Sequence, residues 1–438
     1  MFGYSMVQMV RAHADKLERP LREQLLTMYK PFKWTPCFLH NMLEGMVKRN
    51  KKYSVIIEFQ EGCYETGCQQ VDGIMTQHKK NKIKSHFPRV SCCSAEITPN
   101  GLEALLSNCK DIKRVYLNSE VKAFLNVAVP SARAKRIIRN GKELTGDGVK
   151  IAIIDTGIYP HPDLSGRITD FVDFINNRKE PYDDNGHGTH CAGDAASAST
   201  TYMGPARKAN LVGVKVLDRV GAGSLETVMQ GVDWCIQYNE NNPNDKIDII
   251  SLSLGSPAQY YGSDDRDPMV RIVEEAWASG IVVCVAAGNE GPEPRTVASP
   301  GISDQVITVG ALDDRGTTLK IDDDVASFSS RGPTLYGLRK PDILVPGVNI
   351  ISLRSPNSYL DKLQGSSRVG SYYFSMSGTS MATPICAGIV ALMKEANPSL
   401  TPNEIKTRLL SGTDLWRERD DNVYGTGYIN AERSIPNE

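Results

Sequence analysis

The sequence predicts an α/β fold from about residue 148 onward, with a parallel sheet covered by helices on both faces. Short runs of apolar, mostly β-branched residues alternate there with amphipathic stretches. The apolar runs lie at positions 149–157, 209–217, 246–255, 280–289 and 305–312. Strands that are apolar throughout are buried on both sides, which is typical of parallel strands joined by helices.

Two of the stretches between these runs have helical periodicity, at positions 224–239 and 267–280. The first places five apolar side chains on one face: Leu225, Val228, Met229, Val232 and Cys235. In folds of this kind, ligands bind where parallel strands end at their carboxyl edge. Polar residues that directly follow the strands are therefore the candidates for a functional site.

The region before the predicted sheet has a different pattern. Residues 51–125 predict a small α+β unit, with strands at 51–59 and 112–118. A helix is expected at 98–109, with Thr98 as its N-cap.

Residues 1–50 predict a helical N-terminal extension to which we assign no chemistry. The helix expected at 14–30 is broken at Pro20, because proline removes a backbone donor. The expected domains are 1–50, 51–125 and 126–438.

Charge is unevenly distributed along the chain. Residues 1–125 hold 19 Lys and Arg against 12 Asp and Glu, a balance of +7, and the remainder has a balance of −8. The larger part is acidic, so a nucleic-acid partner is not expected. No apolar run is long enough to span a membrane, so no membrane partner is expected either. The N-terminus lacks the apolar core of a secretory signal, which predicts a cytoplasmic protein, with release by another route left open.

The ten cysteines are expected to remain thiols in such a compartment. A zinc site is not expected from the N-terminal cysteines, since they lack paired C-x-x-C spacing. The residues concerned are Cys63, Cys68, Cys92 and Cys93.

Asp155 and His187 are the first candidates for catalysis. Asp155 ends the run at 149–157, where a carboxylate is unfavourable unless a partner meets it, although a simple turn before Gly157 is an alternative. His187 lies between two glycines, and histidine is the usual proton shuttle near neutral pH. His190 lies three positions later without the glutamate of a metal-binding H-E-x-x-H motif, so we interpret it as structural.

Asn289 and Ser380 complete the candidate set. Asn289 ends the run at 280–289, where a side-chain amide suits a developing oxyanion, or simply a turn. Ser380 precedes a small, apolar helix. Since proline is tolerated in a first helical turn, Pro384 predicts a helix start near Thr379 or Ser380. An ordinary N-cap serine is the alternative interpretation.

Four segments resemble the signature segments of the subtilisin-like serine peptidases: IAIIDTGI, NGHGTHCAG, VAAGN and SGTSMATP. They occur in the family's order of Asp, His and Ser, and the similarity extends over roughly residues 126–432. The resemblance implies a serine endopeptidase that forms an acyl-enzyme and needs no catalytic cofactor. It implies a triad of Asp155, His187 and Ser380, with Asn289 and the Ser380 N–H as the oxyanion hole.

The resemblance also implies where protein or peptide substrates bind. The matching positions are Gly221, Ala222, Gly223, Ser253, Leu254, Gly255, Ala286, Ala287 and Gly288. The first six match strands that flank an extended peptide, and the last three match a wall of the primary specificity pocket. No carboxylate is evident in these segments, which predicts a preference for apolar or aromatic residues before the cleaved bond.

Residues 51–125 resemble the inhibitory pro-domain of the family. This implies an intramolecular inhibitor that docks on the catalytic domain and is cut near Leu125–Asn126, with the opposite charges favouring docking. A permanently attached accessory domain is the alternative.

The sequence departs from the family at one metal site. Residues 197–211 lack the Asn-rich loop that holds calcium in many relatives, so no calcium site is assigned. Acidic clusters at 264–267 and 322–324 are interpreted as solvated loops, with a structural ion such as calcium as the alternative. Cys191 lies one helical turn after His187, which predicts inhibition by thiol-directed reagents.

Two other functional classes fit the sequence less well. A binding or scaffolding module on the same fold would be free to lose the triad and Asn289. A lipase-type esterase would carry a G-x-S-x-G turn, whereas Ser380 is followed by Met381 and Ala382.

Overall fold

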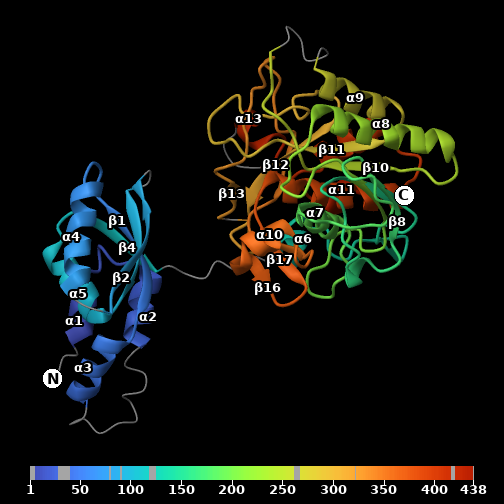
Figure 1. The fold of residues 1–438 in the computed structure, drawn as a ribbon. Helices are drawn as coiled ribbons and strands as arrows, with labels where there is room; N and C mark the ends of the chain where they lie inside the picture. The colour runs from blue at the N-terminus through green and yellow to red at the C-terminus, as the bar shows by residue number, and fades with distance from the viewer. Residues whose placement is uncertain are drawn as a thin grey trace. The chain divides into compact units, whose positions relative to one another are not determined.

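The computed structural model describes residues 5–27, 40–77, 80–88, 91–117, 125–260, 267–320, 322–415 and 420–437. Its contacts group the chain into two units, Met1–Val121 and Lys122–Glu438, and each is described here by itself (Figure 1). Within the described part of the chain, none of the helices is both long enough and apolar enough to span a bilayer.

The N-terminal unit contains a four-stranded antiparallel sheet. Its order is β2 (Lys82–Phe87), β3 (Cys92–Ile97), β1 (Tyr53–Phe59) and β4 (Ile112–Leu117). Its helices are α1 (Ser5–Ala12), α2 (Arg19–Leu26), α3 (His40–Asn50), α4 (Tyr64–Gln77) and α5 (Pro99–Asn108). Thr98 caps α5, as predicted, by accepting a hydrogen bond from the N–H of Gly101 at 3.2 Å.

Helices α1 and α2 share a hydrophobic core with this sheet. Met6 of α1 and Leu21 of α2 are fully buried in the same hydrophobic core as Val55 of β1. Pro20 was predicted to break a helix, but it lies at the second position of α2, where its missing N–H is tolerated. The boundaries predicted at residues 50 and 125 stay predictions, and residues 118–124 lie outside the described part.

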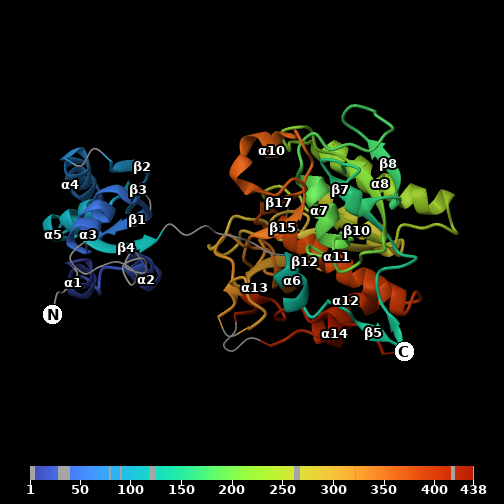
Figure 2. The same ribbon diagram turned by 90° about the horizontal axis from the view of Figure 1, so that it is seen from below.

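The C-terminal unit is built on a mostly parallel sheet with the order β13–β12–β11–β10–β7–β9–β8, in which β14 also pairs with β12. Strands β12, β10, β7 and β8 of this sheet are labelled in Figure 2. The strands are β7 (Lys150–Asp155), β8 (Ile168–Asp173), β9 (Asn210–Lys215), β10 (Ile249–Leu252), β11 (Val282–Ala286), β12 (Ile307–Asp313), β13 (Asp324–Val325) and β14 (Ile343–Pro346). Only β13 pairs antiparallel among these described strands. All five predicted strand runs are present.

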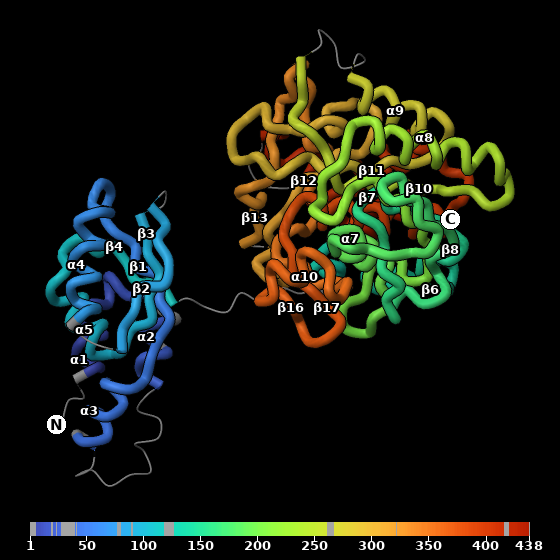
Figure 3. The backbone as a smooth tube through the Cα atoms, viewed as in Figure 1, coloured from blue at the N-terminus to red at the C-terminus, as the bar shows by residue number. Residues whose placement is uncertain are grey.

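Helices pack on this sheet in pairs, α7 (His187–Ala196) with α11 (Thr379–Ala396) and α8 (Leu225–Asn241) with α9 (Pro268–Ala278) (Figures 1 and 3). The other helices are α6 (Leu125–Ser131), α10 (Tyr359–Leu363), α12 (Pro402–Ser411), α13 (Asp421–Tyr424) and α14 (Ala431–Ser434), with single 3₁₀ turns at Pro162–Leu164 and Gly365–Ser367. The small strands are β5 (Ile138–Arg139), β6 (Lys142–Glu143), β15 (Ile350–Leu353), β16 (Arg368–Val369) and β17 (Tyr373–Met376).

The carboxyl ends of the parallel strands bring distant parts of the chain together. Asp155 is the last residue of β7, Ser253 directly follows β10, and Ala286 is the last residue of β11. Because β10 pairs in parallel with both β7 and β11, these three ends lie at the same edge of the sheet. The predicted polar residues therefore gather at this edge.

Candidate active site

Asp155 and His187 form a hydrogen-bonded pair at the end of β7. Asp155 is fully buried, and its two carboxylate oxygens lie 2.8 and 2.9 Å from Nδ1 of His187, the first residue of α7. The Oδ1 atom also accepts the N–H of Thr156 at 2.7 Å. These contacts fix the orientation of the ring and leave its other nitrogen, Nε2, facing away from the carboxylate.

The pair also determines the protonation of the ring. Burial favours the neutral imidazole, but the charge and hydrogen bond of Asp155, together with the neighbouring Cys191, outweigh burial and raise the pKa of His187 well above 6.5. The His187 side chain is 19% exposed, so the ring still reaches the open side of the site. Such a histidine accepts a proton readily from a neighbouring group.

Glycines beside His187 allow α7 to start close to β7. Gly186 has a φ of 108°, in the left-handed region. A Cβ at Gly188 would lie 2.2 Å from the carbonyl oxygen of Gly157 and 3.1 Å from the Cβ of Asp155. A side chain at residue 188 would therefore push His187 away from its carboxylate partner.

Ser380 is the second residue of α11, which confirms the helix start predicted near Thr379 or Ser380. Its hydroxyl donates to the carbonyl of Ser253 at 3.0 Å. Among the hydrogen bonds of the described residues, none joins this hydroxyl to the His187 ring. Catalytic hydrogen bonds are often long or unformed until substrate binds.

The sulfur atom of Cys191 nevertheless contacts both His187 and the backbone of Ser380. Cys191 Sγ lies 3.7 Å from His187 Nδ1 and donates to the carbonyl of Ser380 at 3.4 Å. Asp155, His187 and Cys191 are also the only described trio whose metal-ligand atoms lie within 4.8 Å of one another. The His187 nitrogen in that trio already bonds to both carboxylate oxygens, so we describe the trio as a hydrogen-bonded cluster.

Pro384 has a different role from the predicted one. It is the sixth residue of α11, inside the helix rather than in its first turn, so an intrahelical bond is missing after all. The carbonyl left free is that of Ser380, four residues earlier. The hydroxyl of Ser253 donates to it at 2.8 Å, together with the Cys191 thiol.

Asn289 lies in the turn after β11. Its Oδ1 accepts the backbone N–H of Thr379 at 2.9 Å and the Thr379 hydroxyl at 3.1 Å, which orients the side-chain amide. A Cβ at Gly378 would lie 3.6 Å from both Asn289 Nδ2 and Ser380 N. Asn289 Nδ2 and the backbone nitrogen of Ser380 thus both lie beside Gly378.

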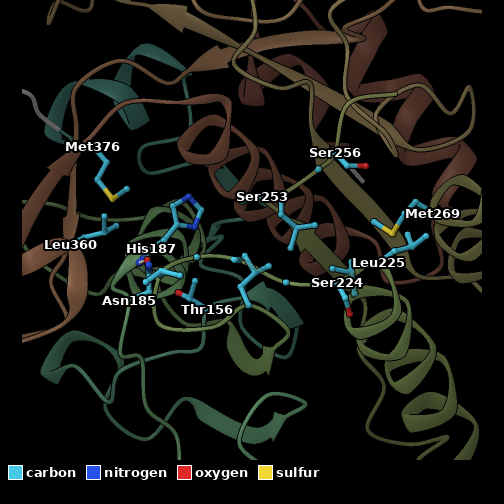
Figure 4. A pocket seen from close by; sticks show the side chains of 18 residues that line it. Thr156, Asn185, His187, Ser224, Leu225, Ser253, Ser256, Met269, Leu360 and Met376 are labelled. Carbon is cyan, nitrogen blue, oxygen red and sulfur yellow. Dashed lines mark hydrogen bonds between the residues drawn. The ribbon is translucent and has the colours of Figure 1, made fainter. Parts of the chain in front are cut away.

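Two pockets adjoin these residues. One, of about 580 Å³, is lined by His187 and by apolar side chains such as Leu225 and Met269, which lie on its other side (Figure 4). The second, of about 470 Å³, is lined by Ser380 and Asn289. The two share the segment 253–256, so together they flank the candidate residues.

Most of the predicted substrate-binding residues line these pockets. They are Gly221, Ala222, Gly223, Ser253, Leu254, Gly255, Ala286 and Gly288. Ala287 does not line either pocket. Its backbone is hydrogen-bonded to Val309 and Ala298, and it is fully buried.

Sequence reasoning missed two charged residues of the second pocket. Glu290 and Arg295 both line it and are both exposed, although the sequence showed no carboxylate in the matching segments. Glu290 directly follows Asn289, so its position next to the motif was the available signal.

His190 occupies a structural position, as expected. It is fully buried, its Nδ1 lies 2.9 Å from the Asp194 carboxylate, and its Nε2 lies 3.0 Å from the carbonyls of Ile350 and Phe374. Both ring nitrogens are thus occupied away from the pockets. The nine described cysteines are free thiols.

Comparison with known proteins identifies the family. Residues 146–427, more than half of the chain, match the model of the Subtilase family. The chain belongs to the subtilases. It is 62% identical over 440 residues to Serine protease AprX of Bacillus subtilis (strain 168), a match that covers 100% of both chains.

Further relatives among the subtilases agree. A thermostable alkaline protease of Halalkalibacterium halodurans is 33% identical over 390 residues, which covers 88% of this chain and 92% of the relative. A solved structure of a cold adapted subtilisin-like serine proteinase matches with a TM-score of 0.51 and 29% identity, over 68% of this chain and 96% of that one. The predicted subtilisin-like α/β fold is confirmed, and the protein is a serine endopeptidase that hydrolyses peptide bonds of proteins.

Proposed function

We propose that this subtilase cleaves proteins through Ser380 as nucleophile, His187 as general base and Asp155 as the residue that orients the base. The observation that carries the proposal is the pair of contacts, 2.8 and 2.9 Å, between the Asp155 carboxylate and His187 Nδ1. They leave Nε2 as the nitrogen that takes the Ser380 proton when the hydroxyl turns from Ser253 toward the ring. Attack on the peptide carbonyl then gives an acyl-enzyme, and the imidazolium returns the proton to the leaving amine.

Asn289 and the backbone N–H of Ser380 are the proposed oxyanion donors. The side-chain amide of Asn289 is held by Thr379. Its nitrogen and the backbone nitrogen of Ser380 both lie 3.6 Å from the position that a Cβ on Gly378 would take. Donors fixed in advance stabilise the charge that develops on the substrate oxygen without reorganisation.

The substrate is proposed to bind as an extended strand between the segments 221–223 and 253–255. Both segments consist largely of small residues and line the larger pocket, so main chain can approach main chain. The residue before the cleaved bond is proposed to be apolar or aromatic. Ala286, Val297 and Ala298 line the second pocket, and the charges of Glu290 and Arg295 are opposite in sign and exposed.

The N-terminal unit is proposed to inhibit the catalytic unit and to be removed by self-cleavage near Leu125–Asn126. The support is the opposite charge of the two parts, +7 for residues 1–125 and −8 for the remainder. No separate cofactor takes part in this proposed mechanism.

Intact-mass analysis of the wild type beside Ser380→Ala tests the nucleophile and the maturation together. After incubation, the wild type is expected to lose a fragment that ends near residue 125 and to hydrolyse casein, while Ser380→Ala does neither. Casein hydrolysis by Ser380→Ala would contradict the nucleophile. An active wild type that stays uncut would contradict self-cleavage alone and favour an attached accessory domain.

A further inference from the structure

Two buried carboxylates lie next in register beyond the last paired residues of β12 and β13. The strands pair antiparallel with Asp313 opposite Asp324, so the next residues in register are Asp314 and Asp323. Residues directly opposite have Cβ atoms about 4.5–5.5 Å apart. Asp314 and Asp323 are each only 4% exposed. The cluster at 322–324 was predicted to be solvated, and for Asp323 this prediction is wrong.

The oxygen atoms of these two carboxylates have almost no partners. Asp314 Oδ1 accepts the N–H of Gly316 at 3.0 Å, but Asp314 Oδ2 and both oxygens of Asp323 have no hydrogen-bond partner among the residues that the structure describes. Three buried carboxylate oxygens, on residues that follow and precede two paired strands, are thus unpartnered among the described residues.

The neighbouring acidic pair is satisfied. Asp313 Oδ2 lies 2.7 Å from Arg315 Nη1, and Asp324 Oδ1 accepts the Tyr424 hydroxyl at 2.9 Å. The lack of partners is therefore specific to the buried pair and is not shared by the whole acidic cluster.

The nearby lysine is already engaged. Lys320 Nζ pairs with the carboxylate of Asp414 and lies 4.1 Å from the centre of the Tyr428 ring. No Lys, Arg or His of the described ranges lies within 4.0 Å of either buried carboxylate. Like charges opposite each other and buried without a partner are strongly unfavourable, so the pair requires a proton or a cation.

The acidity of the pair agrees with this requirement. Burial raises the pKa of Asp314 to about 6. Burial, together with the charges of Asp314 and Asp322, raises the pKa of Asp323 to about 7, although Lys320 acts in the opposite direction.

We propose that Asp314 and Asp323 form a binding site for one hard divalent cation of the calcium type, with their three unpartnered oxygens as protein ligands. Two carboxylates match the charge of such a cation. Calcium accepts carboxylate and water oxygens in irregular arrangements, whereas magnesium demands a near-ideal octahedron. A site with two carboxylates, in which water supplies the remaining ligands of the coordination shell, therefore fits calcium better than magnesium.

The site is connected to the proposed oxyanion donor by the segment that follows β13. Ser330 N donates to the carbonyl of Gly288 at 2.9 Å, and Glu290 N donates to Ser330 Oγ at 3.1 Å, so this segment holds the turn on both sides of Asn289. A cation that fixes the start of the segment is therefore expected to stabilise this turn and the fold around it.

Calorimetric titration with calcium chloride tests the site in full-length Ser380→Ala protein, which avoids self-cleavage, after removal of metals with EDTA at mildly alkaline pH. We expect binding in this parent and an affinity lower by about tenfold or more after a further Asp314→Asn or Asp323→Asn change. Both variants are expected to fold, since asparagine removes the like-charge repulsion. Calcium should raise the unfolding midpoint of the parent by several degrees and leave both variants unchanged.

Asp322→Asn is the matched control, because this neighbouring side chain is exposed, and it should bind calcium as the parent does. Magnesium should bind more weakly than calcium. The proposal would be overturned if the parent bound no calcium, if both buried-site variants bound it as tightly as the parent, or if magnesium bound as tightly.

Discussion

Ser253 and Ser380 are joined by two reciprocal hydrogen bonds. The Ser380 hydroxyl donates to the Ser253 carbonyl at 3.0 Å, and the Ser253 hydroxyl donates to the Ser380 carbonyl at 2.8 Å. The second bond is available because Pro384 has no N–H to occupy that carbonyl. The proposed nucleophile is thus fixed by the strand end of β10 as well as by its own helix.

Replacing Ser253 with alanine removes one donor to this carbonyl and leaves only the weaker Cys191 thiol. We expect the free energy of unfolding to fall by about 0.5–1.5 kcal/mol, the usual net contribution of one hydrogen bond, since the Cys191 thiol still donates to this part-buried carbonyl. The kcat should fall as well, since Ser380 loses a constraint, while KM changes little. Urea unfolding in the Ser380→Ala background and peptide kinetics in the active enzyme measure the two effects.

Ser256→Ala serves as the comparison, because Ser256 lines the same pockets but is exposed. Equal behaviour of the two alanine variants would show that the reciprocal bonds do not position Ser380.

Asn289→Leu removes the proposed side-chain donor to the oxyanion. The kcat should fall by about 10²–10³, or about 2.7–4 kcal/mol of barrier, the range measured for removal of this donor in a subtilisin. KM for a peptide anilide should change little, because the donor acts mainly in the transition state. A loss below about fivefold in kcat would argue against this role for Asn289.

The raised pKa of His187 predicts an activity that increases toward alkaline pH. Only the neutral ring accepts the Ser380 proton, so kcat/KM should fall as the pH decreases through the His187 pKa, which lies well above 6.5 because Asp155 and Cys191 together outweigh burial. A pH profile of kcat/KM on a chromogenic peptide measures this midpoint. A midpoint at or below 6.5 would be inconsistent with the observed pair.

The surroundings of Cys191 refine the predicted sensitivity to thiol reagents. Its side chain is fully buried, and burial raises the pKa of the thiol to about 12, so iodoacetamide should leave activity intact. A mercurial that reaches Sγ would displace the His187 ring, which lies 3.7 Å away, and should inhibit. Assays of the wild type beside Cys191→Ser decide the point, and equal inhibition of both would refute it.

The parallel strands could be predicted because their runs are apolar and β-branched throughout. The edge strand β8 was missed, since its residues are mostly half-buried and polar residues interrupt it. In the N-terminal unit α4 was missed, because two glycines and several polar residues weaken its helical pattern. Both β8 and α4 form because of their contacts with neighbouring strands and helices more than because of their own composition.

The candidate site was predictable where a motif places chemistry at a strand or helix end, as for Asp155 and Ser380. The hydroxyl of Ser253 bonding to the Ser380 carbonyl was not, because it depends on how closely β10 approaches α11. The burial of Asp323 was not predictable either. The acidic run by itself predicts a solvated loop. Its burial at Asp323 depends on the pairing of β12 with β13, which the sequence does not reveal.

The proposed activation of Ser380 by His187 is tested most directly by mapping the adduct of phenylmethylsulfonyl fluoride by mass spectrometry. The native enzyme should carry a single sulfonyl group on Ser380 and lose casein hydrolysis in proportion to labelling, and His187→Ala should remain unlabelled. Labelling at another serine, or full casein hydrolysis by an enzyme sulfonylated at Ser380, would contradict the proposal.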